Sequence, residues 1–231
     1  MNETGERNRA RWMFLSLCLF FSIPVLAQLA PIDPWEADIR AFEQADLADP
    51  PEPGGVLFIG SSSIRFWNSL QSDFPGVAII RRGFGGSEIR DATRLAARIV
   101  TPYRPRLIVM YAGDNDLASG RTAQQVRDDF ASFVARVRRD LPAVQIDWIT
   151  IKPSPARANL LEAMRSANAL VTRYAKAQAG VRVIDVFTPM LDADGQPRAG
   201  LFGEDGLHMN RAGYQVWIDT IAPFLQEPVR H

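Results

Sequence analysis

Residues 56–64 read Val-Leu-Phe-Ile-Gly-Ser-Ser-Ser-Ile, and this stretch carries the pattern that decides the fold. Four consecutive apolar residues, with no alternation of polar and apolar side chains, predict a strand that is buried on both faces. Gly60 and the three serines then end the apolar run, as expected where a strand gives way to a helix. The stretch therefore predicts a strand–turn–helix unit of an α/β protein.

Similar apolar runs recur along the chain. Rich in Val and Ile, they predict five strands at residues 56–59, 77–80, 107–111, 146–151 and 181–186. Helical patterns accompany them at residues 35–48, 122–140, 157–178 and 211–224. Alternating strands and helices predict a parallel sheet covered on both faces. With 231 residues, the chain is long enough for one sizeable core and short for two.

Residues 122–140 show the clearest helical pattern. Thr122 and Gln125 have the spacing of a capping box, in which each side chain accepts a backbone N–H of the first turn. One apolar stripe follows, made of Val126, Phe130, Phe133, Val134 and Val137. Gly180 suits the C-terminal cap of the helix expected over residues 157–178.

Chemically useful residues follow the first three of these strands, at the edge where open parallel sheets bind ligands. Ser62 follows the first strand, Gly86 lies in Gly-Phe-Gly-Gly-Ser (83–87) after the second, and Asn115 lies in Gly-Asp-Asn-Asp (113–116) after the third. A serine at a helix start, a glycine N–H and an asparagine amide can each assist at an oxyanion. Each segment alone also fits a helix cap or a turn.

The fourth segment is Asp-Gly-Leu-His at residues 205–208, before the last helix. An Asp three residues before a His can hold the Nδ1–H and leave Nε2 as a base. The chain has two histidines and the other is the terminal residue His231, so histidine-dependent chemistry depends on His208. A purely structural histidine is the alternative for this residue taken alone. Together the four segments supply the nucleophile, oxyanion donors and oriented base that acyl transfer requires.

These segments resemble the blocks of the SGNH hydrolase family, also called GDSL-type esterases and lipases. Residues 60–62 resemble the Gly-Asp-Ser block, Gly86 resembles the oxyanion glycine, residues 113–116 match G-x-N-D, and residues 205–208 match D-x-x-H. The resemblance covers roughly residues 55–225. Ser61 stands where the family usually has Asp, which leaves three adjacent serines as candidates for the nucleophile.

The resemblance implies a flavodoxin-like, three-layer α/β/α sandwich with a central five-stranded parallel sheet. It implies hydrolysis of carboxylic esters or thioesters with no metal and no other cofactor. Ser62, Asp205 and His208 would be the catalytic residues. The backbone N–H groups of Ser62 and Gly86 and the side chain of Asn115 would form the oxyanion hole.

Two other classes of protein stay open. One is a non-catalytic ligand- or glycan-binding domain on the same fold, against which the complete set of catalytic residue types argues. The other is a nucleotide- or flavin-binding protein, but Glu88 occupies the last glycine position of the G-x-G-x-x-G fingerprint. One usable histidine and a single cysteine, Cys18, do not make a zinc site of ordinary composition.

The expected partner is a small-molecule, glycan or lipid ester. We favour a short acyl group, because no long apolar insertion resembles a lipase lid. Acidic and basic residues balance at 26 each, so no net charge favours nucleic acid. Four cations near the strand ends either bind a polar or anionic substrate group or face solvent, namely Arg65, Arg82, Lys152 and Arg157. The sequence leaves the oligomeric state open.

The N-terminus resembles a secretory signal peptide. Arg7, Arg9 and Arg11 precede an apolar run of about 15 residues, shorter than the ~20 that span a bilayer. Val25-Leu26-Ala27 then offers small or compact residues at the two positions that a signal peptidase reads. We expect a signal peptide at residues 1–27, a linker and helix at 28–54, and the hydrolase domain at 55–231. Export to the periplasm or medium follows, with anchoring by an uncleaved signal as the alternative.

Cleavage after Ala27 is the first prediction. Expression in a bacterial host with a functional export pathway should yield a chain that begins at Gln28, because signal peptidase requires small residues just before its cut. Intact-mass measurement of the exported protein checks this. A full-length chain that begins at Met1 and stays in the cytoplasm would contradict it.

Overall fold

The first strand, β1 (Val56–Gly60), is buried along its whole length and pairs in parallel with a strand on each side. In the computed structural model, which describes residues 33–226, the sheet has the order β2-β1-β3-β4-β5 and all neighbours are parallel. The remaining strands are β2 (Ile79–Gly83), β3 (Leu107–Tyr111), β4 (Gln145–Ile149) and β5 (Val181–Ile184). The expected flavodoxin-like fold with a five-stranded parallel sheet is confirmed. The predicted signal sequence lies outside the described residues.

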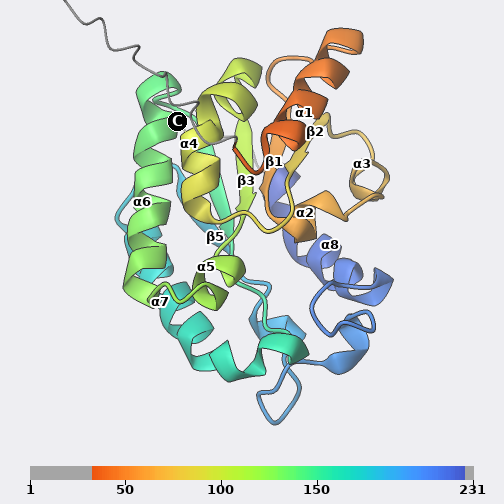
Figure 1. Ribbon diagram of the computed structural model, residues 1–231, viewed down its shortest axis with the longest axis vertical. Helices are drawn as coiled ribbons and strands as arrows, with labels where there is room; N and C mark the ends of the chain where they lie inside the picture. The colour runs from red at the N-terminus through yellow and green to blue at the C-terminus, as the bar shows by residue number, and fades with distance from the viewer. Residues whose placement is uncertain (1–32, 227–231) are drawn as a thin grey trace, which may run out of the picture. The chain divides into compact units, whose positions relative to one another are not determined.

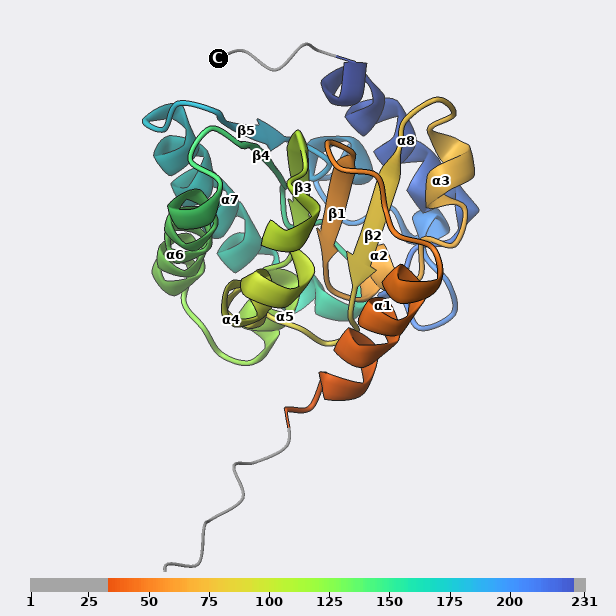
Figure 2. The ribbon, with the colours of Figure 1, turned by 90° about the horizontal axis from the view of Figure 1, so that it is seen from above.

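Helices cover both faces of this sheet (Figures 1 and 2). One face carries α1 (Glu36–Ala48), α4 (Ile89–Ile99), α6 (Ala123–Asp140) and α7 (Leu161–Lys176). The other carries α2 (Ser62–Arg65), α3 (Leu70–Asp73) and α8 (Arg211–Gln226). The short α5 (Asp114–Ala118) follows β3, and 3₁₀ turns lie at Thr101–Tyr103, Pro155–Leu160, Thr188–Met190 and Ala199–Leu201.

Side chains of β1 alternate between two apolar cores. Leu57 and Ile59 are fully buried in the core under α4, α6 and α7, whereas Val56 and Phe58 are fully buried in the core under α2, α3 and α8. Such two-sided burial explains why this strand lacks polar alternation. No helix of the described part of the chain has the length and apolar character needed to cross a bilayer.

The two edge strands differ from their predictions. Residues 77–80 were expected as a strand, whereas β2 runs from Ile79 to Gly83. Arg81 and Arg82 belong to the strand because the edge gives each a partner: Arg81 is exposed and donates to the Trp67 carbonyl, and Arg82 is buried beside polar acceptors. Half-buried residues also occur in β5. The expectation that all five strands are buried on both faces is therefore wrong at the edges.

Other boundaries shift by a few residues for local reasons. The capping box of Thr122 and Gln125 is confirmed at the start of α6. Strand β4 covers Gln145–Ile149 instead of 146–151, and β5 ends at Ile184 because Asp185 accepts the N–H groups of the following turn. The helix expected from residue 157 begins at Leu161, since Arg157 has non-helical angles (φ −124°, ψ 27°).

Close contact between β1 and β3 leaves no space for a side chain at Gly60. This residue has φ +151°, and a Cβ atom there would lie 1.8 Å from the Tyr111 carbonyl oxygen. Gly60 is also the last residue of β1, directly before the three serines. A glycine at this position therefore sets how closely the serine turn approaches the end of β3.

Substitution of Gly60 by Ala should lower the free energy of unfolding by about 4 kcal/mol or more, because backbone atoms cannot move away from the new methyl group. Gly76→Ala is the matched control. Gly76 also has positive φ (+81°), but a Cβ atom there meets nothing within 4 Å, so only the conformational cost of about 1–2 kcal/mol is expected. Urea unfolding followed by circular dichroism measures both. Equal losses for the two variants would contradict the steric argument.

Candidate active site

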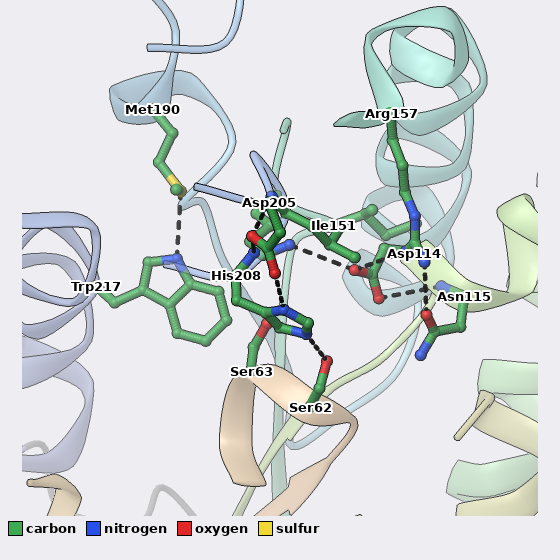
Figure 3. Close-up of polar contacts among 12 residues, drawn as sticks. Ser62, Ser63, Asp114, Asn115, Ile151, Arg157, Met190, Asp205, His208 and Trp217 are labelled. Carbon is green, nitrogen blue, oxygen red and sulfur yellow. Dashed lines mark hydrogen bonds and ion pairs between the residues drawn. The ribbon is translucent and has the colours of Figure 1, made fainter. Parts of the chain in front are cut away.

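Ser62 is the first residue of α2, directly after the turn that ends β1. Ser61 precedes it as the N-cap in an extended conformation and is fully buried. Ser63 is also buried, and its carbonyl accepts a hydrogen bond from the Tyr214 hydroxyl at 3.0 Å. Among the three serines, Ser62 is the half-buried one, and its Oγ lies 3.0 Å from His208 Nε2. Ser62 thus differs from its two neighbours in that its hydroxyl lies within hydrogen-bond distance of the His208 ring (Figure 3).

His208 is held by the turn that precedes α8. Asp205 Oδ2 lies 2.5 Å from His208 Nδ1, while Asp205 Oδ1 accepts the backbone N–H groups of Leu207 and His208 at 2.9 Å each. These backbone hydrogen bonds, followed by the one from the His208 ring, lower the pKa of Asp205 to about 2. The exposed Phe66 ring also packs against the imidazole in a T-shaped arrangement, with centroids 4.9 Å apart. Asp205 is therefore an ionised partner of His208 at neutral pH.

Asn115 approaches from α5, on the other side of Ser62. Its Nδ2 donates to the Ser87 carbonyl at 3.0 Å, and its Oδ1 accepts from Arg157 Nη2 at 2.9 Å. These two contacts define which end of the amide is oxygen and which is nitrogen. An amide nitrogen has two hydrogens, so Asn115 keeps one more donor besides the bond to Ser87.

Behind Asn115 lies a buried ionic cluster of Asp114, Lys152 and Arg157. Asp114 Oδ2 is 3.4 Å from Lys152 Nζ and 3.0 Å from Arg157 Nη1. Burial alone would raise the pKa of Asp114, but the two cations outweigh it and the pKa is lowered. Burial lowers the pKa of Lys152, against the attraction of Asp114. The non-helical backbone at Arg157 is what brings this side chain to Asp114 and Asn115.

The four cations singled out in the sequence are neither free nor merely solvated. Lys152 and Arg157 belong to the cluster around Asp114. Arg82 is buried and forms an ion pair with Asp46 at 2.5 Å, on the far side of β2 from Ser62. Arg65 is exposed and lies 3.6 Å from Asp38 of α1. The solvated alternative is therefore wrong for Arg82 and Lys152, which are buried in ion pairs.

Gly86 lies in the loop between β2 and α4. It is exposed and has φ +77°, a left-handed conformation that glycine adopts without strain. The neighbouring Ser87 donates through its hydroxyl to the Phe84 carbonyl at 2.8 Å and through its carbonyl receives Asn115. The loop that carries Gly86 is therefore tied to the asparagine.

Sequence reasoning missed the buried acids next to this loop. Glu88 and Asp91 form a reciprocal capping box that starts α4, and Asp116 Oδ1 accepts the Ile89 N–H at 3.1 Å. The Glu-x-x-Asp spacing at 88–91 could have revealed the helix start. No short sequence pattern could have shown that Asp116 binds the same turn, because the two segments are 27 positions apart. Across residues 33–226, no group of three or more His, Cys, Asp or Glu side chains is placed to bind a metal ion.

A parallel sheet of this order, with serine, histidine and aspartate in hydrogen-bonded sequence at its carboxyl edge, defines a hydrolase with a flavodoxin-like fold. The chain belongs to the GDSL-like lipase/acylhydrolase family, whose sequence model matches residues 60–216. No curated protein gives a significant match to the full sequence.

Several solved structures have a similar fold. A protein from Bacteroides fragilis assigned as an acylhydrolase is 22% identical, with a TM-score of 0.73, and the match covers 84% of this chain and 99% of that one. A GDSL-like lipase from Bacteroides thetaiotaomicron is 20% identical (TM-score 0.71; 82% and 98% covered). A family 3 carbohydrate esterase from Talaromyces cellulolyticus is 18% identical (TM-score 0.59; 74% and 96% covered).

Asp116 makes stability depend on pH. Burial raises its pKa from 3.8 to about 7, with the nearby Glu88 charge adding to the effect. Between pH 4 and 7 the folded protein then binds this proton more tightly than the unfolded chain, so the free energy of unfolding falls as pH rises. Asp116→Asn should remove a decline on the order of 2–4 kcal/mol across that window.

Urea unfolding at intervals from pH 4 to pH 8 measures this slope. Asp128→Asn, on the exposed side of α6, is the control and should keep the wild-type profile. A residual slope in Asp116→Asn is expected from Asp91, whose pKa burial also raises. An Asp116→Asn profile that follows the wild type throughout would contradict the assignment.

Proposed function

We propose that this protein is a serine esterase that hydrolyses carboxylic esters with a short acyl group. Ser62 is the nucleophile, His208 the general base and acid, and Asp205 the orienting carboxylate. The single observation that carries the proposal is the unbroken path from Ser62 Oγ to His208 Nε2 at 3.0 Å and from His208 Nδ1 to Asp205 at 2.5 Å. This is the arrangement of an activated nucleophile.

The reaction proceeds in two halves. His208 Nε2 takes the Ser62 proton as Oγ attacks the acyl carbon, and the imidazolium then protonates the departing alcohol. In the second half His208 takes a proton from water as the water oxygen attacks the acyl carbon. The bond to Ser62 Oγ then breaks, His208 returns the proton to that oxygen, and the carboxylic acid leaves. Asp205, ionised at neutral pH, stabilises the imidazolium and holds Nδ1 protonated, so that Nε2 faces Ser62.

The oxyanion would be held by the N–H groups of Ser62 and Gly86 and by the remaining Nδ2 hydrogen of Asn115. Ser62 suits this role because its N–H belongs to the first turn of a helix, where no helical carbonyl accepts it. Asn115 suits it because Arg157 and the Ser87 carbonyl fix the amide orientation. Donors fixed in advance stabilise the developing charge without reorganising.

The surface near Ser62 supports a small acyl group. Among the described residues two large apolar side chains are exposed, Leu47 and Phe66, and Phe66 alone contacts His208. A long acyl chain would need a wider apolar surface than one ring provides. The carbohydrate esterase among the similar folds makes an acetylated sugar a reasonable member of the substrate panel. Export through the N-terminal signal is part of the proposal.

Covalent labelling tests the nucleophile. A fluorophosphonate should attach to Ser62, and Ser62→Ala should abolish both labelling and hydrolysis of p-nitrophenyl acetate. Ser61→Ala and Ser63→Ala are matched controls from the same turn and should keep the label. Tandem mass spectrometry locates the adduct. An adduct on Ser61 or Ser63, or an active Ser62→Ala enzyme, would refute the assignment.

Replacement of Asn115 by Ala should separate an oxyanion donor from a turn residue. Loss of one donor typically lowers kcat by roughly 10²–10³, about 2.7–4 kcal/mol, with KM nearly unchanged because the ground-state carbonyl gains little from the donor. Steady-state kinetics on p-nitrophenyl acetate measures the change, with circular dichroism to confirm folding. Wild-type kcat in the folded variant would remove Asn115 from the mechanism.

A further inference from the structure

Helix α1 lies before the residues that match the family, yet one of its side chains reaches the active-site loop. Trp35 is the N-cap of α1, and its indole Nε1–H donates to the Gly85 carbonyl at 2.9 Å. The indole also packs edge-on against Phe84, with ring centroids 5.9 Å apart and planes at 75°. Trp35 therefore fixes the backbone one residue before Gly86.

The contact matters because Gly85 and Gly86 share one planar peptide group. No cis peptide occurs in the described residues, and in a trans peptide the C=O and the next N–H point in opposite directions. The direction of the Gly85 carbonyl thus sets the direction of the Gly86 N–H. With glycine on both sides, no side chain resists rotation of this peptide, so other groups must hold it.

Two side chains hold the loop from opposite sides of Gly86. Trp35 binds the Gly85 carbonyl, and Asn115 Nδ2 binds the Ser87 carbonyl at 3.0 Å. At the start of the loop, the Phe84 N–H donates to the Gly60 carbonyl at 2.9 Å, which ties it to the serine turn. The Gly86 N–H therefore lies between two fixed carbonyls.

Ion pairs and apolar contacts hold helix α1 against the rest of the fold. Arg98 of α4 forms ion pairs with Glu36 at 2.6 Å and Glu43 at 2.7 Å. Ile39 is fully buried in the core beneath α1. At the other end of the helix, Asp46 binds both Arg82 and the Tyr103 hydroxyl. Figure 2 shows α1 along the β2 side of the sheet, next to the strand from which the Gly86 loop departs.

We propose that Trp35 is a positioning residue for the oxyanion hole: its indole N–H holds the Gly85–Gly86 peptide so that the Gly86 N–H faces the oxyanion. The inference rests on the proposed function, because Gly86 has a donor role only if Ser62 forms a tetrahedral intermediate. Without the indole N–H, the peptide can turn and present a carbonyl oxygen to the developing negative charge. The transition state loses stabilisation, while substrate binding is little affected.

Two variants remove the N–H with different effects on packing. Trp35→Phe keeps an aromatic ring beside Phe84, and benzothienylalanine in place of Trp35 keeps the bicyclic shape with sulfur where the N–H was. Both should lower kcat on p-nitrophenyl acetate by about 10-fold, less than the 10²–10³ for complete loss of an oxyanion donor, with KM within about twofold of the wild type. Labelling of Ser62 by a fluorophosphonate should slow in parallel.

Glu43→Gln is the matched control on the same helix. It weakens the ion pair with Arg98 without touching the loop, so melting temperature should fall slightly while kcat stays at the wild-type value. Wild-type kcat in the benzothienylalanine enzyme, or an equal loss in Glu43→Gln, would overturn the positioning role. A wild-type protein that neither cleaves esters nor labels at Ser62 would instead refute the proposed function, and the inference with it.

Discussion

Parallel pairing of β1 between β2 and β3 is the constraint on which the site depends. Because the three strands run in one direction, the segments after them meet at one edge of the sheet. Ser62 follows β1, the Gly86 loop follows β2 and Asn115 follows β3. The point where the chain order reverses between β1 and β3 leaves space beyond the strand ends. His208 then needs only the turn before α8 to reach Ser62.

A chain of polar contacts lies behind Asn115. Asp114 binds two cations, and one of them, Arg157, also binds Asn115. The Arg157 guanidinium places a permanent positive charge next to the oxygen of the asparagine amide. A positive charge at this position strengthens the amide as a hydrogen-bond donor and favours negative charge in front of it. Asp116, two residues along, is fully buried, and burial raises its pKa to about 7.

The sequence predicted the central strands, the α6 capping box and the four segments at the sheet edge, because each depends on residues within one short window. The predictions failed where the local structure depends on contacts with residues far away in the sequence. Arg82 stays in β2 only because Asp46 and Tyr103, from elsewhere in the chain, satisfy its guanidinium. Arg157 leaves the expected helix to meet Asp114. The contact of Trp35 with the Gly85 carbonyl joins residues 50 positions apart, and no periodic pattern in the sequence could have revealed it.

The position of α1 also bears on where this protein begins as a folding unit. The family match starts at residue 60, but the compact unit of the structure starts at Pro34 and includes the helix. A gene that began at residue 60 would lack α1 and also residues 56–59 of β1, and Arg82 and Arg98 would lose the acidic partners that α1 provides. The folded unit therefore includes residues 34–59, which lie before the part of the chain that the family model matches.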